Sequence, residues 1–437
     1  MFEFTPYTQS VQPTLESEEW GVESGVRGER RKNNRLSIPR LSSHPTPHYP
    51  LPTFSSFPMT SILATTAERE AILLAPYAFP SGKTAGRRHS EIESPYRGPF
   101  QRDRDRIVHS SAFRRLSGKM QVFTGDMGDY HRTRLTHTQE VASIARTIGR
   151  ALRLNEDLIE ALALFHDIGH PPFGHAGEDA LNECLAEQGG FSHNKFALTL
   201  AEELELRYPD FPGLNLSAEV LAGQETRADK TRAYSAQDGH APLLEVQVVE
   251  AADSMTYNAH DTDDAVKLGL VTLDELADVP VVREAIAEVR GRYGQQSQDV
   301  ERKCVVHELI DRQVVDLLQA AVAFLTQHPQ LDHEAVRHSS FRVGPSLALV
   351  QPKRELEVFL YDKVYRHPQL LTVRKSAQNQ LRLMFDRLCA EPTLLPPRFQ
   401  QRAESVPVSR AVGDYLAGMT DRFCNQQFAK VFGSGQG

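Results

Sequence analysis

The sequence predicts a mainly α-helical protein, because helical periodicity and helix-capping signals are frequent and strand patterns are scarce. Apolar residues recur three or four positions apart at Val141, Ile144, Ala145, Ile148 and Leu152. This spacing is typical of an amphipathic helix. Thr136 can cap that helix, and Thr272 and Glu275 form a capping box for a later one. An alternating pattern is confined to one short ribbon near 339–351.

Predicted helices follow one another along most of the chain. They begin near Thr65 and cover about 136–152, 158–165, 192–207, 242–267, 299–327, 370–391 and 408–428, with a further one after Thr272. Gly169 and the pair Pro171–Pro172 end the helix at 158–165. No internal repeat is visible.

Composition divides the chain into segments. Residues 1–58 contain eight prolines and eight serines, and we expect this extension to be disordered, because it cannot bury enough apolar surface to offset the entropy of ordering. An N-terminal arm at 59–100 follows, then a helical domain at 101–335 and a mainly helical subdomain at 336–437. With 437 residues, 40% of them hydrophobic, the chain can build a large core.

Charge and cysteine usage narrow the class of protein. The net charge of -8 gives no global attraction to DNA or anionic membranes, so phosphate affinity requires a local basic cluster. No apolar run reaches the ~20 residues of a membrane span. The four cysteines lack a CxxC pair, which favours reduced thiols over a disulfide framework. We therefore expect a cytoplasmic protein with no membrane association.

Two histidines and two aspartates form the first candidate site. His137, the adjacent pair His166–Asp167 and Asp253 fall on three different predicted helices, and helical bundles build metal sites from inward side chains on facing helices. This mixed set of nitrogen and oxygen ligands suits a first-row divalent cation. Two alternatives remain open: a lone buried histidine is usually a hydrogen-bonded core residue, and His166 to His170 mimics the H-E-x-x-H motif of zinc proteases, with aspartate for glutamate.

Several motifs carry a resemblance to a known family. Residues 166–178 read HDIGHPPFGHAGE, and shorter stretches are RDRDR at 102–106, AFRRL at 112–116, RTRLTH at 132–137, FPGLNL at 211–216 and YNAHD at 257–261. Together they resemble the deoxyguanosine triphosphate triphosphohydrolase-like branch (the dGTPase family) of the HD superfamily, over about residues 85–400.

The resemblance has implications for fold, metal and assembly. It implies an all-α HD-domain helical bundle with the HD phosphohydrolase domain at 101–335, usually in a homo-oligomer. It also implies that His137, His166, Asp167 and Asp253 bind the metal, which is Mn, Mg or another first-row ion such as Fe, Co, Ni or Zn.

A basic segment precedes the metal motif. Residues 97–119 carry Arg97, Arg102, Arg104, Arg106, Arg114, Arg115 and Lys119. Arginine forks suit triphosphate oxygens, and on this basis Arg114 is a candidate substrate contact. The alternative is a surface ladder of ion pairs with Asp103 and Asp105. Arg134 lies one helical turn before His137. By resemblance, Arg134 contacts phosphate and Gln121 contacts the sugar or the α-phosphate side.

The stretch after Asp253 suggests a nucleoside site. Tyr257, His260 and Asp261 follow Asp253 at four, seven and eight residues, so the four residues share one helical face. Resemblance supports Tyr257 and Asp261 as deoxyribose contacts, with the ring packed so as to disfavour a 2′-hydroxyl. The alternative is a solvated acidic stripe, because Asp263 and Asp264 follow.

The expected reaction is hydrolysis of a dNTP at the α-phosphate, by metal-activated water, to deoxynucleoside and tripolyphosphate. His175 is the candidate for proton transfer. Glu178 lies three residues later and can orient it, and His193 can contact the phosphates. The family's corresponding residues carry such roles. Departures from the family pattern at Phe196, Thr199, Ala218 and the pair Thr226–Arg227 bear on base preference, allosteric activation by a second dNTP and oligomer contacts.

Two other functions remain open. A different HD phosphohydrolase, either a nucleotidase or a cyclic-nucleotide phosphodiesterase, would share the metal site. A nucleotide-binding or nucleic-acid-binding regulator with little catalysis would use the Arg-rich segment and the basic N-terminal stretch. Weak single-stranded DNA binding is a further expectation.

Overall fold

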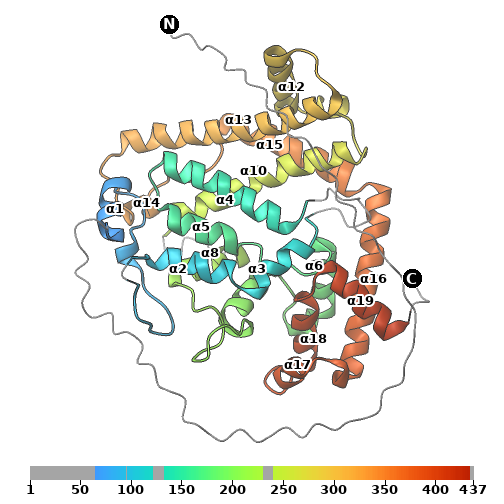
Figure 1. Cartoon of the computed structure of the whole chain (residues 1–437). Helices are drawn as coiled ribbons and strands as arrows, with labels where there is room; N and C mark the ends of the chain where they lie inside the picture. The colour runs from blue at the N-terminus through green and yellow to red at the C-terminus, as the bar shows by residue number, and fades with distance from the viewer. Residues whose placement is uncertain (1–63, 95, 122–131, 230–239, 434–437) are drawn as a thin grey trace, which may run out of the picture. The chain divides into compact units, whose positions relative to one another are not determined.

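The computed structural model describes residues 64–94, 96–121, 132–229 and 240–433. The extension at 1–58, for which the sequence predicts disorder, lies outside the described residues. The described chain is helical throughout (Figure 1), as the sequence predicts.

The α-helices follow in chain order. They are α1 (Thr66–Leu73), α2 (Pro99–Val108), α3 (Ser111–Arg115), α4 (Arg134–Ala151), α5 (Glu156–Phe165), α6 (Gly174–Cys184), α7 (His193–Thr199), α8 (Ala218–Ala228), α10 (Leu244–Lys267), α11 (Leu273–Leu276), α12 (Pro280–Tyr293), α13 (Gln298–Gln327), α14 (Ala335–His338), α15 (Leu347–Phe359), α16 (Pro368–Ala390), α17 (Pro397–Arg402), α18 (Val408–Ala417) and α19 (Asp421–Phe432). Two π-helical turns, Leu200–Leu204 and Leu360–Tyr365, extend α7 and α15.

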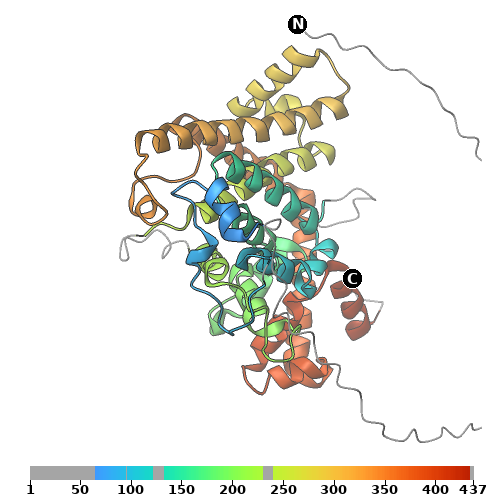
Figure 2. The ribbon, with the colours of Figure 1, turned by 60° about the vertical axis from the view of Figure 1, so that its left-hand side comes forward.

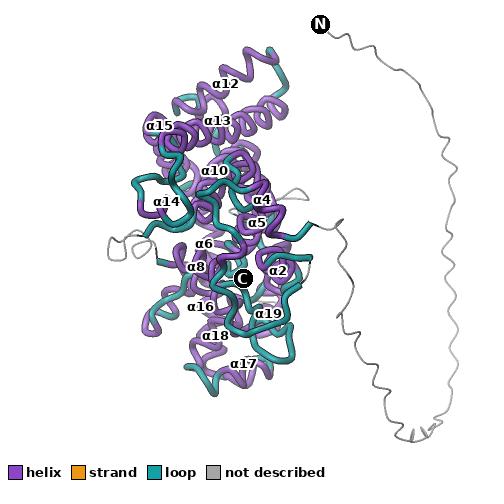
Figure 3. The backbone as a smooth tube through the Cα atoms, turned by 90° about the vertical axis from the view of Figure 1, so that its left-hand side faces the viewer, coloured by secondary structure: helices purple, strands orange, loops and turns teal. Residues whose placement is uncertain are grey.

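Strand structure is almost absent from the described residues. They contain only isolated bridges, such as Arg87 with Ser217 and Met120 with Thr133, and Figure 3 shows helices and loops without a sheet. The ribbon expected near 339–351 is wrong, because Leu347–Phe359 forms α15. Pro352 lies in the second turn of that helix, and a proline there disfavours a helical interpretation of the sequence.

Three helices form the centre of the fold. The helices α4, α5 and α10 pack against one another, and α13 covers α4 and α10 (Figure 1). The helix α5 is apolar on nearly all sides, with Leu158, Ile159 and Leu162 buried together with most of their neighbours, and such a helix must lie inside the protein. Helices α2 and α8 cover its remaining faces.

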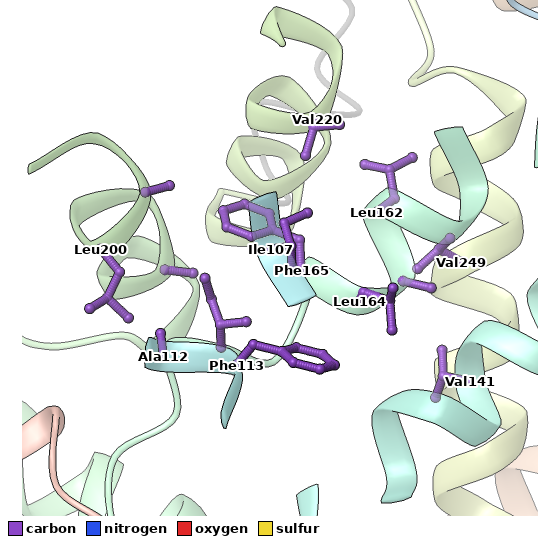
Figure 4. Close-up of a cluster of buried hydrophobic side chains, with 14 of the residues drawn as sticks. Ile107, Ala112, Phe113, Val141, Leu162, Leu164, Phe165, Leu200, Val220 and Val249 are labelled. Atoms are coloured by element: carbon purple, nitrogen blue, oxygen red, sulfur yellow. The ribbon is translucent and has the colours of Figure 1, made fainter. Parts of the chain in front are cut away.

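Small residues allow this close packing. A Cβ atom on Gly149 of α4 would lie 2.3 Å from the side chain of Ile159, and one on Gly223 of α8 would lie 2.4 Å from that of Leu162. Around these contacts, the side chains of Phe113, Phe165, Val220 and others form one hydrophobic cluster (Figure 4).

The remaining helices form two further groups. The helices α12, α13 and α15 share a second cluster that includes Val282, Ile286, Val305, Leu309 and Leu356. The helix α16 packs against α6 and α18. Figure 2 shows α17 to α19 (red) at the opposite end of the described chain from α13 (orange).

Predicted caps are partly correct. Thr272 and Glu275 form the expected capping box at α11. For α4, however, the cap is Thr133, three residues before the predicted Thr136, and its hydroxyl accepts from the Thr136 backbone N–H. None of the helices among the described residues combines the length and apolar character needed to cross a bilayer.

Candidate metal centre and adjoining pocket

The structure brings the four predicted metal ligands together from the three central helices. His137 lies in the first turns of α4, His166 caps the C-terminal end of α5 with Asp167 directly after it, and Asp253 lies in the middle of α10. The packing of α4, α5 and α10 therefore places all four side chains in one region.

Distances within this group are short. His137 Nε2 lies 3.1 Å from Asp253 Oδ1, and His166 Nε2 lies 3.6 Å from the same oxygen and 3.5 Å from Asp167 Oδ1. Ligand atoms of His137, His166 and Asp167 all lie within 4.8 Å of one another. One cation could be shared by these side chains after small adjustments.

The hydrogen bonding of His166 fits a metal ligand. Its Nδ1 lies 2.6 Å from the Ala163 carbonyl oxygen and donates to it, which leaves Nε2 as the unprotonated nitrogen. That Nε2 is buried and has no hydrogen-bond partner. Leaving a buried polar atom unpaired costs roughly 1–3 kcal/mol, and a bound cation would remove this cost. The residues present therefore fit a divalent cation.

A histidine and a glutamate orient the second imidazole. His137 Nδ1 lies 3.4 Å from Nδ1 of His260, whose Nε2 lies 2.5 Å from a carboxylate oxygen of Glu140. If His260 donates to Glu140 and accepts from His137, then Nε2 of His137 presents its lone pair to the centre. A carboxylate that fixes the tautomer of a ligand histidine is a common feature of metal sites. The helical spacing of His260 from Asp253 does not by itself indicate this role.

Arginines hold the two carboxylates. Arg134 Nη1 lies 2.9 Å from Asp167 Oδ2, and Arg227 Nη2 lies 2.5 Å from Asp253 Oδ2. Burial alone would raise the pKa of each aspartate, but the facing histidines and arginines outweigh it and hold both pKa values well below their usual range. Both aspartates are therefore ionised and available as ligands.

Arg134 supports the centre in a manner that the sequence did not indicate. It is buried, and its second terminal nitrogen donates to the backbone oxygen of Gln121 at 3.0 Å. The guanidinium thus connects Asp167 to the segment that carries Gln121. Contact of Arg134 with a phosphate stays a prediction.

The three predicted catalytic residues meet at Glu178. One carboxylate oxygen of Glu178 lies 3.1 Å from His175 Nδ1, and the other lies 2.8 Å from His193 Nδ1. Burial would raise the pKa of Glu178, but the bonds from the two imidazoles lower it far below its usual value. The side chain of His175 remains about half exposed, at 49%, so this imidazole can exchange protons with a ligand.

His170 connects the two groups. Its Nδ1 lies 3.0 Å from Asp167 Oδ1, and its ring stacks on that of His193 with 3.7 Å between centroids. Its Nε2 is buried without a hydrogen-bond partner. From the sequence, His170 enters only through the similarity of residues 166–170 to the H-E-x-x-H motif of zinc proteases.

A pocket of about 230 Å³ adjoins His175. Its lining includes Gln121, Phe173, His175, Tyr257, Tyr361, Tyr365 and Arg374. Gln121 and Tyr257 had been predicted as substrate contacts. Tyr361, Tyr365 and Arg374 had not, because they lie more than a hundred residues after Tyr257 and match no motif.

Asp261 is buried beside this pocket. It accepts a hydrogen bond from the Tyr365 hydroxyl, and the rings of Tyr365 and Tyr257 lie 6.3 Å apart. Burial raises the pKa of Asp261 to about 7. The alternative of a solvated acidic stripe is therefore wrong for Asp261, whereas Asp263 and Asp264 pair with Arg132.

Ion pairs account for most arginines of the Arg-rich segment. Its arginines pair with carboxylates, for example Arg104 with Glu160 at 3.2 Å and Arg106 with Glu91 at 2.5 Å. Arg114 is exposed on α3, where its guanidinium donates to the His109 carbonyl oxygen at 3.3 Å, and its contacts include no residue of the metal group or the pocket. The ion-pair alternative therefore describes most of this segment: Asp105 pairs with Arg97 and Arg104, and the other acidic partners lie outside the segment. Contact of Arg114 with a phosphate stays a prediction.

The C-terminal helices support the segments that carry the site. Asp421 of α19 accepts the backbone N–H groups of Met120 and Phe173, each at 2.9 Å. Lys119 is buried between the carbonyl oxygens of His170 and Ala417, and burial lowers its pKa to about 7.

Comparison with known proteins agrees with this architecture. A family model described as the HD domain matches residues 134–258, which contain the four candidate ligands, and one described as the phosphohydrolase-associated domain matches residues 346–430, which contain Tyr361, Tyr365 and Arg374.

Similar curated proteins are found in several bacteria. The chain is 43% identical to the deoxyguanosinetriphosphate triphosphohydrolase-like protein of Bordetella pertussis, with 83% of this chain and 97% of that protein covered. Proteins of the same description from Ralstonia pickettii (41% identical, 82% and 94% covered) and Thiobacillus denitrificans (42% identical, 82% and 97% covered) are also similar. The chain therefore belongs to the family of deoxyguanosinetriphosphate triphosphohydrolase-like proteins, which contain an HD domain.

Proposed function

We propose that this protein hydrolyses deoxynucleoside triphosphates, of the dGTP type, to deoxynucleoside and tripolyphosphate with the help of a divalent cation. The observation that carries the proposal is the buried, unpaired Nε2 of His166, which faces Asp167 and Asp253 within 3.6 Å. The names of the similar curated proteins support the substrate class.

His137, His166, Asp167 and Asp253 would hold the cation. When bound, such an ion polarises phosphoryl oxygens and lowers the pKa of a coordinated water toward neutrality. Manganese, magnesium, iron, cobalt, nickel and zinc are all compatible with imidazole and carboxylate ligands, although imidazole favours the later ions of the series.

In this proposal, His175 moves a proton at its Nε2, because its Nδ1 is held by Glu178. An imidazole with an exposed edge and an oriented partner is suited to general acid–base catalysis. His193, which the same carboxylate holds through both its ring and its backbone N–H, would contact the phosphates. Arg134 would contact a phosphate directly, or it would hold Asp167 in place beside the phosphates.

The nucleoside is proposed to enter the pocket beside His175. There the ring of Tyr257 would pack against the deoxyribose and disfavour a 2′-hydroxyl, and Gln121 would contact the sugar or the α-phosphate side. Asp261 would accept a sugar hydroxyl at Oδ1, which has no hydrogen-bond partner, while its Oδ2 keeps the bond from the Tyr365 hydroxyl. Homo-oligomer formation, activation by a second dNTP, weak single-stranded DNA binding and a cytoplasmic location stay predictions.

The test is product analysis. The purified chain is incubated with each dNTP and either Mn or Mg, and the products are separated by ion exchange. Deoxynucleoside with tripolyphosphate is expected, and it should be lost in His166→Ala and Asp253→Ala but kept in His307→Ala, an exposed histidine of α13.

Two other outcomes favour other functions. Monophosphate with pyrophosphate would contradict the proposal and favour a different HD phosphohydrolase. No turnover, together with salt-dependent DNA binding, would favour a regulator.

A further inference from the structure

We propose that His240, Glu334 and His338 form a second divalent-cation site of the zinc type, which attaches the chain entering α10 to α14. Nitrogen atoms of the two histidines and an oxygen atom of Glu334 all lie within 4.8 Å of one another. The two imidazole centroids are only 4.0 Å apart, although both residues are exposed. This site shares no residue with the centre at His166.

The backbone holds these residues next to each other. Ala241 N donates to the carbonyl oxygen of Arg337 at 3.0 Å, and Arg337 Nε donates to the carbonyl oxygen of Ala241 at 2.8 Å. Ala241 and Val336 are buried, with 3% and 1% exposed. This pairing of Ala241 with Arg337 holds residues 240 and 338 next to each other, so the backbone brings their side chains together.

The ligand types and distances suit zinc. Zinc in catalytic sites is commonly bound by three protein ligands from histidine and carboxylate, with water in the fourth position, and this exposed group offers the same ligand types. With bonds of about 2.0–2.2 Å, tetrahedral ligands lie roughly 3.3–3.5 Å apart. The three side chains need to move by about 1 Å to reach that geometry from separations of at most 4.8 Å, and exposed side chains can do so at little cost.

Two neighbours modify the site. Arg337 Nη1 lies 3.7 Å from one oxygen of Glu334, and His333 Nε2 lies 3.9 Å from the other. Arg337 competes only weakly with a cation for the Glu334 carboxylate, because its Nε donates to the Ala241 carbonyl oxygen instead. The ring of His333 contacts Phe79 edge to face, so this imidazole is outside the ligand group.

The position of the site gives it a structural role. Residue 240 lies four positions before α10 begins at Leu244, and α10 carries Asp253, Tyr257 and Asp261. A cation bound by residues 240, 334 and 338 would fix the N-terminal end of that helix to α14. We therefore expect zinc to stabilise the folded chain, since a ligand that binds only the native state raises its stability.

The experiment counts zinc. The full chain is freed of metal with a chelator, dialysed against zinc chloride, and analysed for bound zinc per chain by atomic absorption. His240→Ala/His338→Ala should bind one equivalent less than the native chain, and the control His307→Ala should bind the same amount as the native chain. Equal zinc contents in the native chain and the double variant would overturn the proposal.

A second measurement guards against misfolding. Without zinc, the native chain and the double variant should have the same Tm, because the substituted side chains are exposed. With zinc, Tm should rise less in the double variant and in Glu334→Gln than in His307→Ala. Equal increases in all of these proteins would contradict the proposed zinc site. Since both readouts concern zinc binding, they are independent of whether the chain hydrolyses nucleotides.

Discussion

A buried glutamate should make the stability of this protein depend on pH. Glu245, in the first turn of α10, is 1% exposed, and burial raises its pKa to about 7 from 4.5. Its Oε1 accepts the backbone N–H groups of Phe79 and Asn155 at 2.9 and 3.2 Å, and its Oε2 is buried without a partner. The carboxyl group thus connects the N-terminal arm and α5 to α10, and it is best accommodated when neutral.

The sign and size of the effect follow from linkage. The folded state binds the proton more tightly than the unfolded state, so the free energy of unfolding falls as pH rises from about 4.5 through about 7. With one pKa unit equal to about 1.4 kcal/mol, the ionisation penalty is about 1 kcal/mol at pH 5 and about 3 kcal/mol at pH 8. Glu245→Gln removes this penalty and keeps the oxygen that accepts both backbone bonds.

The assay is thermal or urea unfolding of the native chain and Glu245→Gln at pH 5, 6, 7 and 8. The free energy of unfolding of the variant, relative to that of the native chain, should increase by about 2 kcal/mol between pH 5 and pH 8. Glu187→Gln, at an exposed glutamate, is the control and should show no such trend. A difference between Glu245→Gln and the native chain that stays constant over this pH range would refute the reasoning.

Three further predictions concern the candidate site. Glu178→Gln should reduce kcat by roughly 10²–10⁴, because His175 and His193 lose their common acceptor; calorimetry should find unchanged Mn affinity, and unchanged kcat would contradict the assignment. His260→Gln should weaken Mn binding by roughly 10–100-fold, since His137 loses its orienting partner; Mn affinity equal to that of the native chain would rule out this role. Tyr365→Phe leaves Asp261 without its hydrogen bond; KM for dNTPs should change while Mn affinity stays constant, and an unaltered KM would place the nucleoside elsewhere.

The sequence was sufficient for the helical class and for bringing His137, His166, Asp167 and Asp253 into one hypothesis. His137, His166 and Asp167 lie in or directly after strongly periodic predicted helices. Their polar side chains interrupt an otherwise apolar face, and this interruption is visible in the local sequence. The spacing of Tyr257 and Asp261 from Asp253 is equally local, because a single helix determines which residues share a face.

Residues whose roles depend on distant partners could not be assigned in this way. The arginines between 97 and 115 suggested a triphosphate site, but Glu91, Glu160 and Glu205 neutralise three of them from up to about ninety residues away. Tyr365 reaches Asp261 across 104 residues. Neither contact leaves a spacing pattern in the sequence, because both depend on how separate helices pack.

The two hydrogen bonds that Asp421 accepts have a consequence for truncated forms of the chain. Met120 lies next to Gln121, and Phe173 lies in the turn before His175. The backbone N–H groups of both residues donate to the Asp421 carboxylate of α19. A premature stop codon shortly before residue 421 would delete none of the proposed catalytic residues and should still abolish activity.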